Sequence, residues 1–173
     1  MEFFANIFTN IRVLNKPFND RLDQKVVNHH FRDALVVKRN NKALTPSQIQ
    51  YRIFAYLPSW VNVLMRIRNY LVAFFGFEVA QEGLNPKTEE LSIGDKAGFL
   101  TITEKYNDEI ISFAEDKHMM FYLSVALNEN DIIVSTLVNQ KTLIGRIYVN
   151  AILPFHYVIA RTVINNAIKA GRI

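Results

Sequence analysis

The sequence contains no cysteine, and this absence excludes disulfide bonds, thiolate nucleophiles and cysteine-ligated zinc or iron–sulfur sites. The lack of cysteine fits a reducing, cytoplasmic setting. No glycine-rich strand–turn–helix fingerprint, P-loop or low-complexity segment occurs. The 20 basic and 16 acidic residues nearly balance, and the basic ones are scattered rather than clustered. Because no basic stripe exists, nucleic acid is not an expected partner.

An uninterrupted hydrophobic run is also missing. The most apolar segment, SWVNVLMRIRNYLVAFFGF (residues 59–77), carries Arg66, Arg68 and Asn69 at its centre. Two central arginines would cost several kcal/mol in a bilayer, so this segment predicts a buried amphipathic helix and no transmembrane segment. The amino-terminal residues have Glu2 near their start, no basic region and no small-residue cleavage site, so no signal peptide is expected.

What the chain does have is enough apolar residues to form a core. It is 173 residues long and 50% hydrophobic, which is typical of one globular domain. We expect an amino-terminal extension over residues 1–27, packing on a single domain over residues 28–173.

The first part of that domain predicts one strand followed by two short helices. Residues 30–41, HFRDALVVKRNN, contain a β-branched run that ends in an Asn-Asn turn signal. Thr45 and Gln48 then form a capping-box pattern around a proline, which predicts the start of a helix. After Pro58, a second helix is predicted over residues 59–75.

The middle of the chain has the alternation of β-strands. A polar loop is predicted over residues 82–98, and the segments that follow are separated by turn residues too short for crossover connections. The pattern therefore predicts an antiparallel meander with strands at residues 99–106, 109–115, 118–127 and 131–140.

A long helix is predicted from Thr142 to Gly171, kinked or divided at Pro154. Its polar side is formed by Arg146, Asn150, Tyr157, Arg161, Asn165 and Lys169. Its apolar side is formed by Ile147, Ala151, Phe155, Val158 and Ile159. We expect the apolar side to pack on other parts of the protein.

This order of elements defines an α+β protein and resembles the helix-grip fold, in which a curved antiparallel sheet wraps a long carboxy-terminal helix. The helix-grip superfamily includes the birch-pollen allergen, START lipid-transfer domains and polyketide cyclases. The resemblance implies a cavity between sheet and helix that takes small apolar molecules, although a fold by itself does not specify function.

Four local strings carry a closer resemblance: HFRDAL at 30–35, PSWVNVLMRIRNYL at 58–71, FAEDKHMMFYLSV at 113–125 and GRIYVNAILPFHYVIAR at 145–161. They are similar to a bacterial family known only as a domain of unknown function, which occurs alone or after a nucleotide-binding oxidoreductase domain. That family has no established activity or catalytic residues, so the resemblance supports the fold and adds little about function.

The string FAEDKH places Glu115, Asp116 and His118 close together, as a metal site or an acid–base site would. A tight hairpin explains the same residues without chemistry. In that interpretation Asp116 and Lys117 form the turn, and Glu115 faces His118 across the two strands. We favour the hairpin and expect no metal or other cofactor.

Alternation assigns the two faces of the strand that follows. The uniformly apolar set is expected to face the terminal helix, which leaves His118 and Tyr122 on the other face. The apolar set is Met119, Phe121, Leu123 and Val125. If the faces were exchanged, His118 and Tyr122 would line a semi-polar pocket.

The remaining histidines are weaker candidates. His29 and His30 point to opposite sides of an extended chain and cannot easily bind one ion. His156 follows Pro154, where packing or a backbone hydrogen bond is the commoner role and proton transfer the rarer one.

Arg66 and Arg68 are each candidates to meet a ligand's carboxylate at the cavity mouth, although pairing with an internal acid such as Asp33 is favoured over this role. Trp60 and Tyr70 lie nearby in the sequence. The full set of candidate ligand-binding residues is Trp60, Arg66, Tyr70, Phe121, Leu123 and Phe155.

Three hypotheses for the function follow. The favoured one is a non-catalytic protein that holds a small hydrophobic or lipid-like ligand between sheet and helix. The second is a cyclase- or isomerase-type enzyme that uses His118 or His156 as the acid–base group, with Tyr122 or Tyr106 as hydrogen-bond partner. The third is an interaction module with a solid core, whose segment FFANIFTNI docks on a membrane surface or on another subunit, as in a homodimer.

Overall fold

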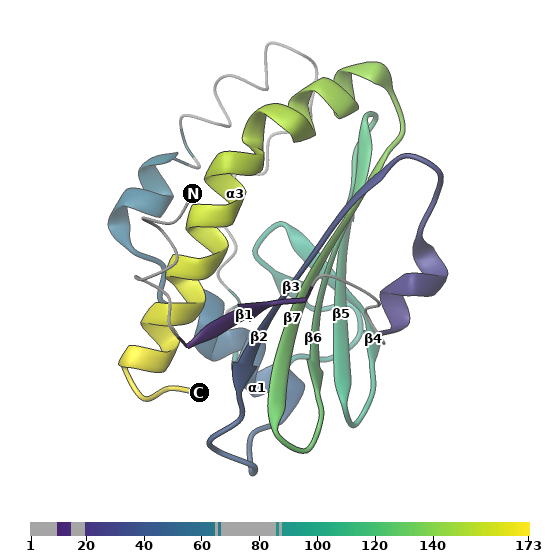
Figure 1. The fold of residues 1–173 in the computed structure, drawn as a ribbon. Helices are drawn as coiled ribbons and strands as arrows, with labels where there is room; N and C mark the ends of the chain where they lie inside the picture. Colours follow the sequence, from purple (N-terminus) through teal and green to yellow (C-terminus); the bar gives the residue numbers. More distant parts are fainter. Residues whose placement is uncertain (1–9, 15–19, 65, 67–85, 87) are drawn as a thin grey trace.

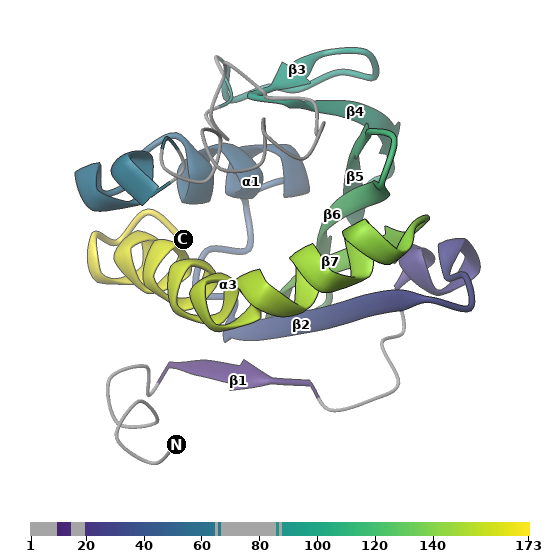
Figure 2. The ribbon, with the colours of Figure 1, turned by 90° about the horizontal axis from the view of Figure 1, so that it is seen from above.

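A curved, seven-stranded antiparallel sheet forms the body of the molecule, and the long carboxy-terminal helix lies on its concave side (Figures 1 and 2). This computed structural model describes residues 10–14, 20–64, 66, 86 and 88–173. The predicted α+β architecture with a sheet curved around a terminal helix is confirmed.

The order of strands in the sheet is simple because most neighbours in sequence are neighbours in space. From one edge to the other it runs β1 (Ile11–Val13), β2 (His30–Lys38), β7 (Asp131–Gln140), β6 (Met119–Leu127), β5 (Glu109–Glu115), β4 (Leu100–Lys105) and β3 (Lys96–Ala97). The predicted meander corresponds to β4–β7, and the strand predicted within residues 30–41 is β2. Sequence patterns missed β1 and β3, which are only 3 and 2 residues long.

The helices agree with the capping signals in the sequence. Thr45 caps α1 (Pro46–Phe54): its hydroxyl accepts a hydrogen bond from the Gln48 backbone, and the Gln48 side chain accepts one from the Thr45 backbone. Residues 59–64 are helical, as predicted, and the part of that predicted helix from residue 67 onward lies outside the described residues.

The concave face of the sheet supplies the main core. Leu35, Val134, Val125 and Ile110 stand opposite one another on four adjacent strands, and all four are buried. Leu123 lies two residues before Val125 and is buried on the same face, as the alternation predicted.

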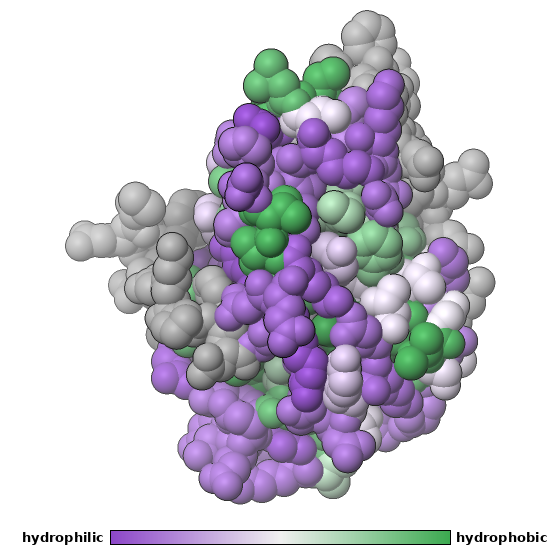
Figure 3. Space-filling view, turned by 90° about the vertical axis from the view of Figure 1, so that its right-hand side faces the viewer, coloured by the Kyte–Doolittle hydropathy of each residue, from purple (hydrophilic) through white to green (hydrophobic). Residues whose placement is uncertain are grey.

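The convex face carries a second, smaller cluster under η2 (Arg21–Lys25), a short 3₁₀ helix that the sequence did not predict. Leu22 is buried there against Ile111 and Leu137. Arg32 of β2 binds Asp20 and Asp23, so ion pairs tie this segment to the sheet. The side of the molecule drawn in Figure 3 is largely hydrophilic, with separate apolar patches.

The terminal helix α3 (Leu143–Lys169) is continuous, so Pro154 does not divide it. Thr142 is its N-cap and accepts a hydrogen bond from the Gly145 amide at 3.1 Å. The expectation for its buried side was wrong: Ile147 and Phe155 are 63% and 59% exposed. The buried residues are Val149 in the first half of the helix and Val163, Ile164, Asn165 and Ala167 near its carboxy-terminal end, where the helix is buried on more than one side.

Candidate functional site

Asp33 and His156 form the one carboxylate–imidazole contact that the described residues place between sheet and terminal helix. The Asp33 carboxylate lies on the concave face of β2, and its Oδ2 is 3.2 Å from Nε2 of His156 on α3. The side chains are 7% and 21% exposed, respectively. The pair is therefore largely desolvated, yet solvent reaches the imidazole.

Aromatic rings flank this pair. The Phe31 ring, two residues before Asp33, meets the His156 ring edge-on with centroids 5.4 Å apart. The Tyr157 ring lies 6.2 Å from that of Phe31 and 5.9 Å from that of His156. Thr136 stands opposite Asp33 on β7 and adds a hydroxyl at this level of the sheet. The site thus combines one charged pair with an aromatic wall.

The geometry fixes which histidine nitrogen can do chemistry. When neutral His156 donates its Nε2 hydrogen to Asp33, Nδ1 is the nitrogen that keeps a free lone pair. A carboxylate that orients a histidine through one nitrogen is a common feature of acid–base sites. The pair can therefore bind a polar group or accept a proton.

His118 has a different environment, at the amino-terminal end of α3. Its side chain is buried, and its Nδ1 lies 2.9 Å from the hydroxyl of Thr142. Its carbonyl oxygen accepts a hydrogen bond from the Lys141 amide at 2.8 Å. His118 thus connects the start of β6 to the cap of α3, and it does not face solvent.

The hairpin between β5 and β6 has its tip one residue later than predicted. Asp116 and Met119 close the turn through a backbone hydrogen bond of 3.0 Å, so Lys117 and His118 are the turn residues. Asp116 stabilises the turn as expected, because its Oδ1 accepts hydrogen bonds from the backbone amides of His118 and Met119.

The predicted pairing of Glu115 with His118 across this hairpin is wrong. Glu115 stands opposite Met120, and its carboxylate binds the Lys141 ammonium at 2.8 Å. The three residues Glu115, Asp116 and His118 therefore have separate partners and do not converge. The described residues contain no group of three or more His, Asp or Glu side chains that could hold a metal ion.

The candidate ligand-binding residues do not form one site. Trp60 and Arg66 are exposed, and Tyr70 lies outside the described residues. The expected pairing of Arg66 with Asp33 is wrong, because Asp33 binds His156 instead. Phe121 and Leu123 lie on the concave face in or against the core, whereas Phe155 projects into solvent.

The other candidates are also separated. His30 makes a contact of 2.6 Å with the Val27 carbonyl oxygen, and its neighbour His29 is exposed. Tyr122 lies on the convex face, where its ring packs 4.8 Å from that of Phe113 and burial raises its pKa. Tyr106 is exposed. The Arg21 guanidinium of η2 lies 4.0 Å from the centre of the Tyr106 ring, so both tyrosines are on the convex side of the sheet, away from His156.

The convex face has an ion-pair cluster that holds η2. Glu109 is 1% exposed and accepts hydrogen bonds from Arg21 at 2.8 Å and from the Ser124 hydroxyl at 2.6 Å. The contact with Glu109 raises the pKa of the Arg21 guanidinium. Arg21 of η2 also pairs with Asp108 at 3.1 Å, so the cluster fastens η2 to the sheet.

Beside it, Lys25 and Glu104 form a second ion pair. Burial would raise the pKa of Glu104, but hydrogen bonds from Lys25 and Tyr106 outweigh burial and lower it. The hydrogen bond to Glu104 raises the pKa of Lys25. The hydroxyl of Tyr106 donates a hydrogen bond to Glu104, and this contact raises the pKa of Tyr106.

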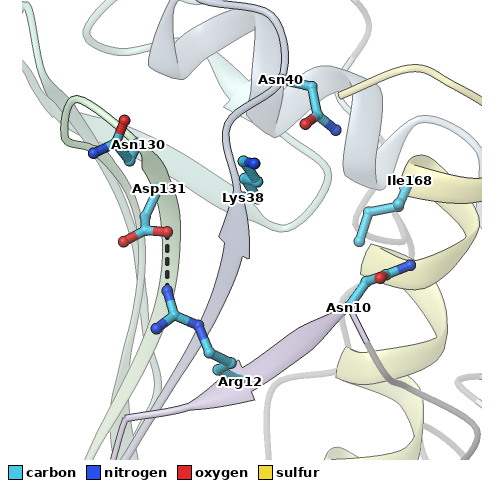
Figure 4. A pocket seen from close by; sticks show the side chains of 7 residues that line it. All are labelled: Asn10, Arg12, Lys38, Asn40, Asn130, Asp131 and Ile168. Carbon is cyan, nitrogen blue, oxygen red and sulfur yellow. Dashed lines mark hydrogen bonds and ion pairs between the residues drawn. The ribbon is translucent and has the colours of Figure 1, made fainter.

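A polar groove of about 470 Å³ lies where β1 meets the ends of β2 and β7 (Figure 4). Its one ion pair joins Arg12 to Asp131 at 3.0 Å. The lining side chains are Asn10, Arg12, Lys38, Asn40, Asn130, Asp131 and Ile168. None of them is a histidine or a hydroxyl nucleophile, so the groove is a weaker candidate for chemistry than the Asp33–His156 pair.

Sequence reasoning considered Asp33 and His156 separately and did not bring them together. They are 123 residues apart, and no motif connects them. The available signal was Asp33 itself, an acidic residue inside a run of buried strand positions, which requires a partner.

Together, the fold and this site define an α+β protein whose curved sheet and terminal helix meet around a carboxylate–imidazole pair. Residues 26–163 match the family model described as "Protein of unknown function (DUF2867)". Because the match covers most of the chain, the protein belongs to that family. No curated protein and no solved structure shows a significant match.

Proposed function

We propose that the protein binds a small, mostly apolar molecule that carries one polar group, and that Asp33 and His156 receive this group. The observation that supports the proposal is a hydrogen-bonded carboxylate–imidazole pair placed between sheet and helix and reached by solvent at His156. Buried polar pairs are costly to keep among apolar side chains unless they have a role or full compensation.

The surroundings favour an apolar ligand body. Phe31 and Tyr157 present aromatic rings beside the pair, and Val138 stands opposite Phe31 on β7. Phe121 follows on β6, opposite Val138. Pockets for small molecules usually combine such apolar walls with few polar groups that fix orientation.

The charge of Asp33 restricts the ligand's polar group. A second carboxylate would be repelled by Asp33, whereas a hydroxyl can donate to it and a carbonyl can accept from a protonated His156. A neutral molecule with a hydroxyl or carbonyl group is therefore the expected class. This differs from the carboxylate ligand that Arg66 alone would favour.

The likeness to the helix-grip fold supports the same place for a ligand. In that fold the cavity lies between the curved sheet and the terminal helix, and Asp33 of β2 meets His156 of α3 between the same two elements.

Binding can be tested with the neutral fluorescent probe N-phenyl-1-naphthylamine, together with solvent extraction and native mass spectrometry of the purified protein. Phe31→Ala and Asp33→Asn should each weaken binding, by roughly tenfold for loss of the aromatic contact. Phe155→Ala is the matched control, since it removes the same side chain from the exposed side of α3.

The proposal fails if the native protein neither carries an extractable molecule nor binds the probe. It also fails if Phe31→Ala and Phe155→Ala weaken binding equally. Thermal unfolding of each variant shows whether the fold is retained, and Asp33→Asn keeps the side-chain volume, so it tests the site even if Phe31→Ala is unstable.

A second function, acid–base catalysis at His156, is favoured by the orientation that Asp33 gives the imidazole. Nδ1 would remove a proton from a carbon next to a carbonyl, and the same nitrogen would return it to another position. Deuterium uptake from D₂O by an aromatic ketone such as 2-tetralone tests this. His156→Gln should abolish the uptake, and uptake by the native protein equal to that in buffer alone would exclude the activity.

A further inference from the structure

The exposed side of α3 forms a continuous apolar surface, which we call the α3 ridge: Leu143, Ile147, Ala151, Phe155 and Val158. All five residues are exposed. Their spacing of four, four, four and three residues puts them on one side of the helix. The sequence predicted most of this side to be buried, and in the folded protein it faces solvent.

The ridge is unusual for a helix that packs on a sheet. Helix α3 is the one helix among the described residues that is long and apolar enough to cross a membrane, and only 17% of its most apolar window is buried. Its other side is fixed to the protein by core residues such as Val163 and by the His156 contact with Asp33. The helix therefore belongs to the domain and still presents an apolar side.

The charged residues of α3 itself are all basic, and Glu115, an acidic side chain near its amino-terminal end, is paired with Lys141. Residues 141–173 contain no Asp or Glu. Arg146 and Arg161 lie along the polar border of the ridge, and Arg161 donates a hydrogen bond of 2.9 Å to the Tyr157 carbonyl oxygen. The Arg161 guanidinium also lies 5.3 Å from the centre of the Tyr157 ring, so a cation and an aromatic ring stand together at this border.

We infer that the α3 ridge docks on an anionic lipid surface, with the helix lying along the membrane rather than crossing it. An exposed side with Leu, Ile and Phe, bordered by Arg and Tyr, is the composition of helices that lie in the interface. The ridge side chains would enter the boundary of the acyl chains, and the arginines would meet lipid phosphates.

The charge pattern argues against a second copy of the chain as the occupant. A two-fold contact through the ridge would bring Arg146 and Arg161 of one copy near the same residues of the other, with no acidic residue on α3 to compensate. An anionic surface matches these charges.

Co-sedimentation with vesicles tests the inference on the full chain. The protein should sediment with vesicles of phosphatidylcholine and phosphatidylglycerol, and much less with phosphatidylcholine alone. Ile147→Ser and Phe155→Ser should each weaken the partition about tenfold, because each removes one inserted side chain. Added salt should also weaken it.

Ile93→Ser is the matched control, because Ile93 is 65% exposed, like Ile147, but lies outside α3. It should leave vesicle binding unchanged. The inference is overturned if Ile147→Ser binds vesicles as well as the native protein does. It is also overturned if the native protein binds neither kind of vesicle. A ridge variant that changes the oligomeric state in light scattering, without changing vesicle binding, would assign the ridge to a protein contact instead.

Binding of vesicles by the α3 ridge is independent of the proposed ligand site at Asp33 and His156. Phe155→Ser should affect vesicles and not the fluorescent probe, whereas Phe31→Ala should affect the probe and not vesicles.

Discussion

Asp33 of β2 and His156 of α3 are joined by a hydrogen bond of 3.2 Å between residues 123 positions apart in the sequence. This contact fixes the rotation of α3 about its axis, because it requires the His156 side of the helix to face the sheet. The opposite side of the helix, with Ile147, is exposed.

The contribution of this contact to stability can be measured with a double-mutant cycle. Asp33→Asn, His156→Gln and the double variant should show a coupling energy on the order of 1 kcal/mol in urea unfolding, since both groups are largely desolvated. A coupling near zero would mean that the two side chains contribute to stability separately.

Two serines that stand opposite each other on β6 and β7 should respond differently to removal of the hydroxyl. Ser124 donates to the buried Glu109 carboxylate, so Ser124→Ala should cost about 1–3 kcal/mol of unfolding free energy. The Ser135 hydroxyl is buried with no hydrogen-bond partner among the described residues, so Ser135→Ala should be neutral or stabilising. Equal effects in chemical denaturation would contradict this assignment.

Gly145 should not tolerate a side chain, although alanine is the better helix former. A Cβ at Gly145 would lie 2.5 Å from the His118 carbonyl oxygen, and that backbone cannot move freely because it also binds Lys141. Gly145→Ala should therefore destabilise the protein by about 1–3 kcal/mol. Its control is Asn150→Ala on the exposed side of α3, which should gain a few tenths of a kcal/mol. A stabilised Gly145→Ala variant in thermal unfolding would contradict the close contact.

The Lys25–Glu104 pair predicts a specific pH dependence. The folded-state pKa of Glu104 is lowered from 4.5, so its contribution is fully present above pH 4.5 and is lost as the pH falls through the folded value. The folded-state pKa of Lys25 is raised from 10.5, so its contribution to stability is fully present below pH 10.5 and is lost as the pH rises through the folded value.

Glu104→Gln should therefore cost about 1 kcal/mol in the window between those limits, a small value because both side chains are about a quarter exposed. The difference from the native protein should vanish in acid. Unfolding free energies measured across pH check this, with Lys96→Gln as a control, because Lys96 hydrogen-bonds to a neutral threonine. A difference that persists at low pH would show that another interaction is responsible.

Much of the fold could be predicted from local patterns, for reasons that the structure makes clear. The alternation in β6 assigned Leu123 and Val125 to the concave face correctly, because a strand has only two sides. Thr45 and Gln48 marked the start of α1, because a cap is a contact between residues three apart. Short elements such as β1 were missed, because three residues carry no periodicity.

The candidate site could not be predicted in the same way. Asp33 was expected to pair with Arg66, and nothing in the sequence connected it with His156. Only the packing of α3 across β2 brings the imidazole to the carboxylate. Likewise, Glu115 stands opposite Met120 and not opposite His118, because the hairpin turn lies one residue later than the sequence pattern predicts.

The sequence by itself determined the strand over residues 30–38, the antiparallel meander, the capped start of α1, the long terminal helix and the apolar side of β6, because all of these depend on residues close together in the chain. The tertiary structure alone decided which side of α3 is buried. That helix is apolar on more than one side, so its hydrophobicity leaves its rotation open. The contacts of Val163 and His156 with the sheet set the rotation and leave the Ile147 side exposed.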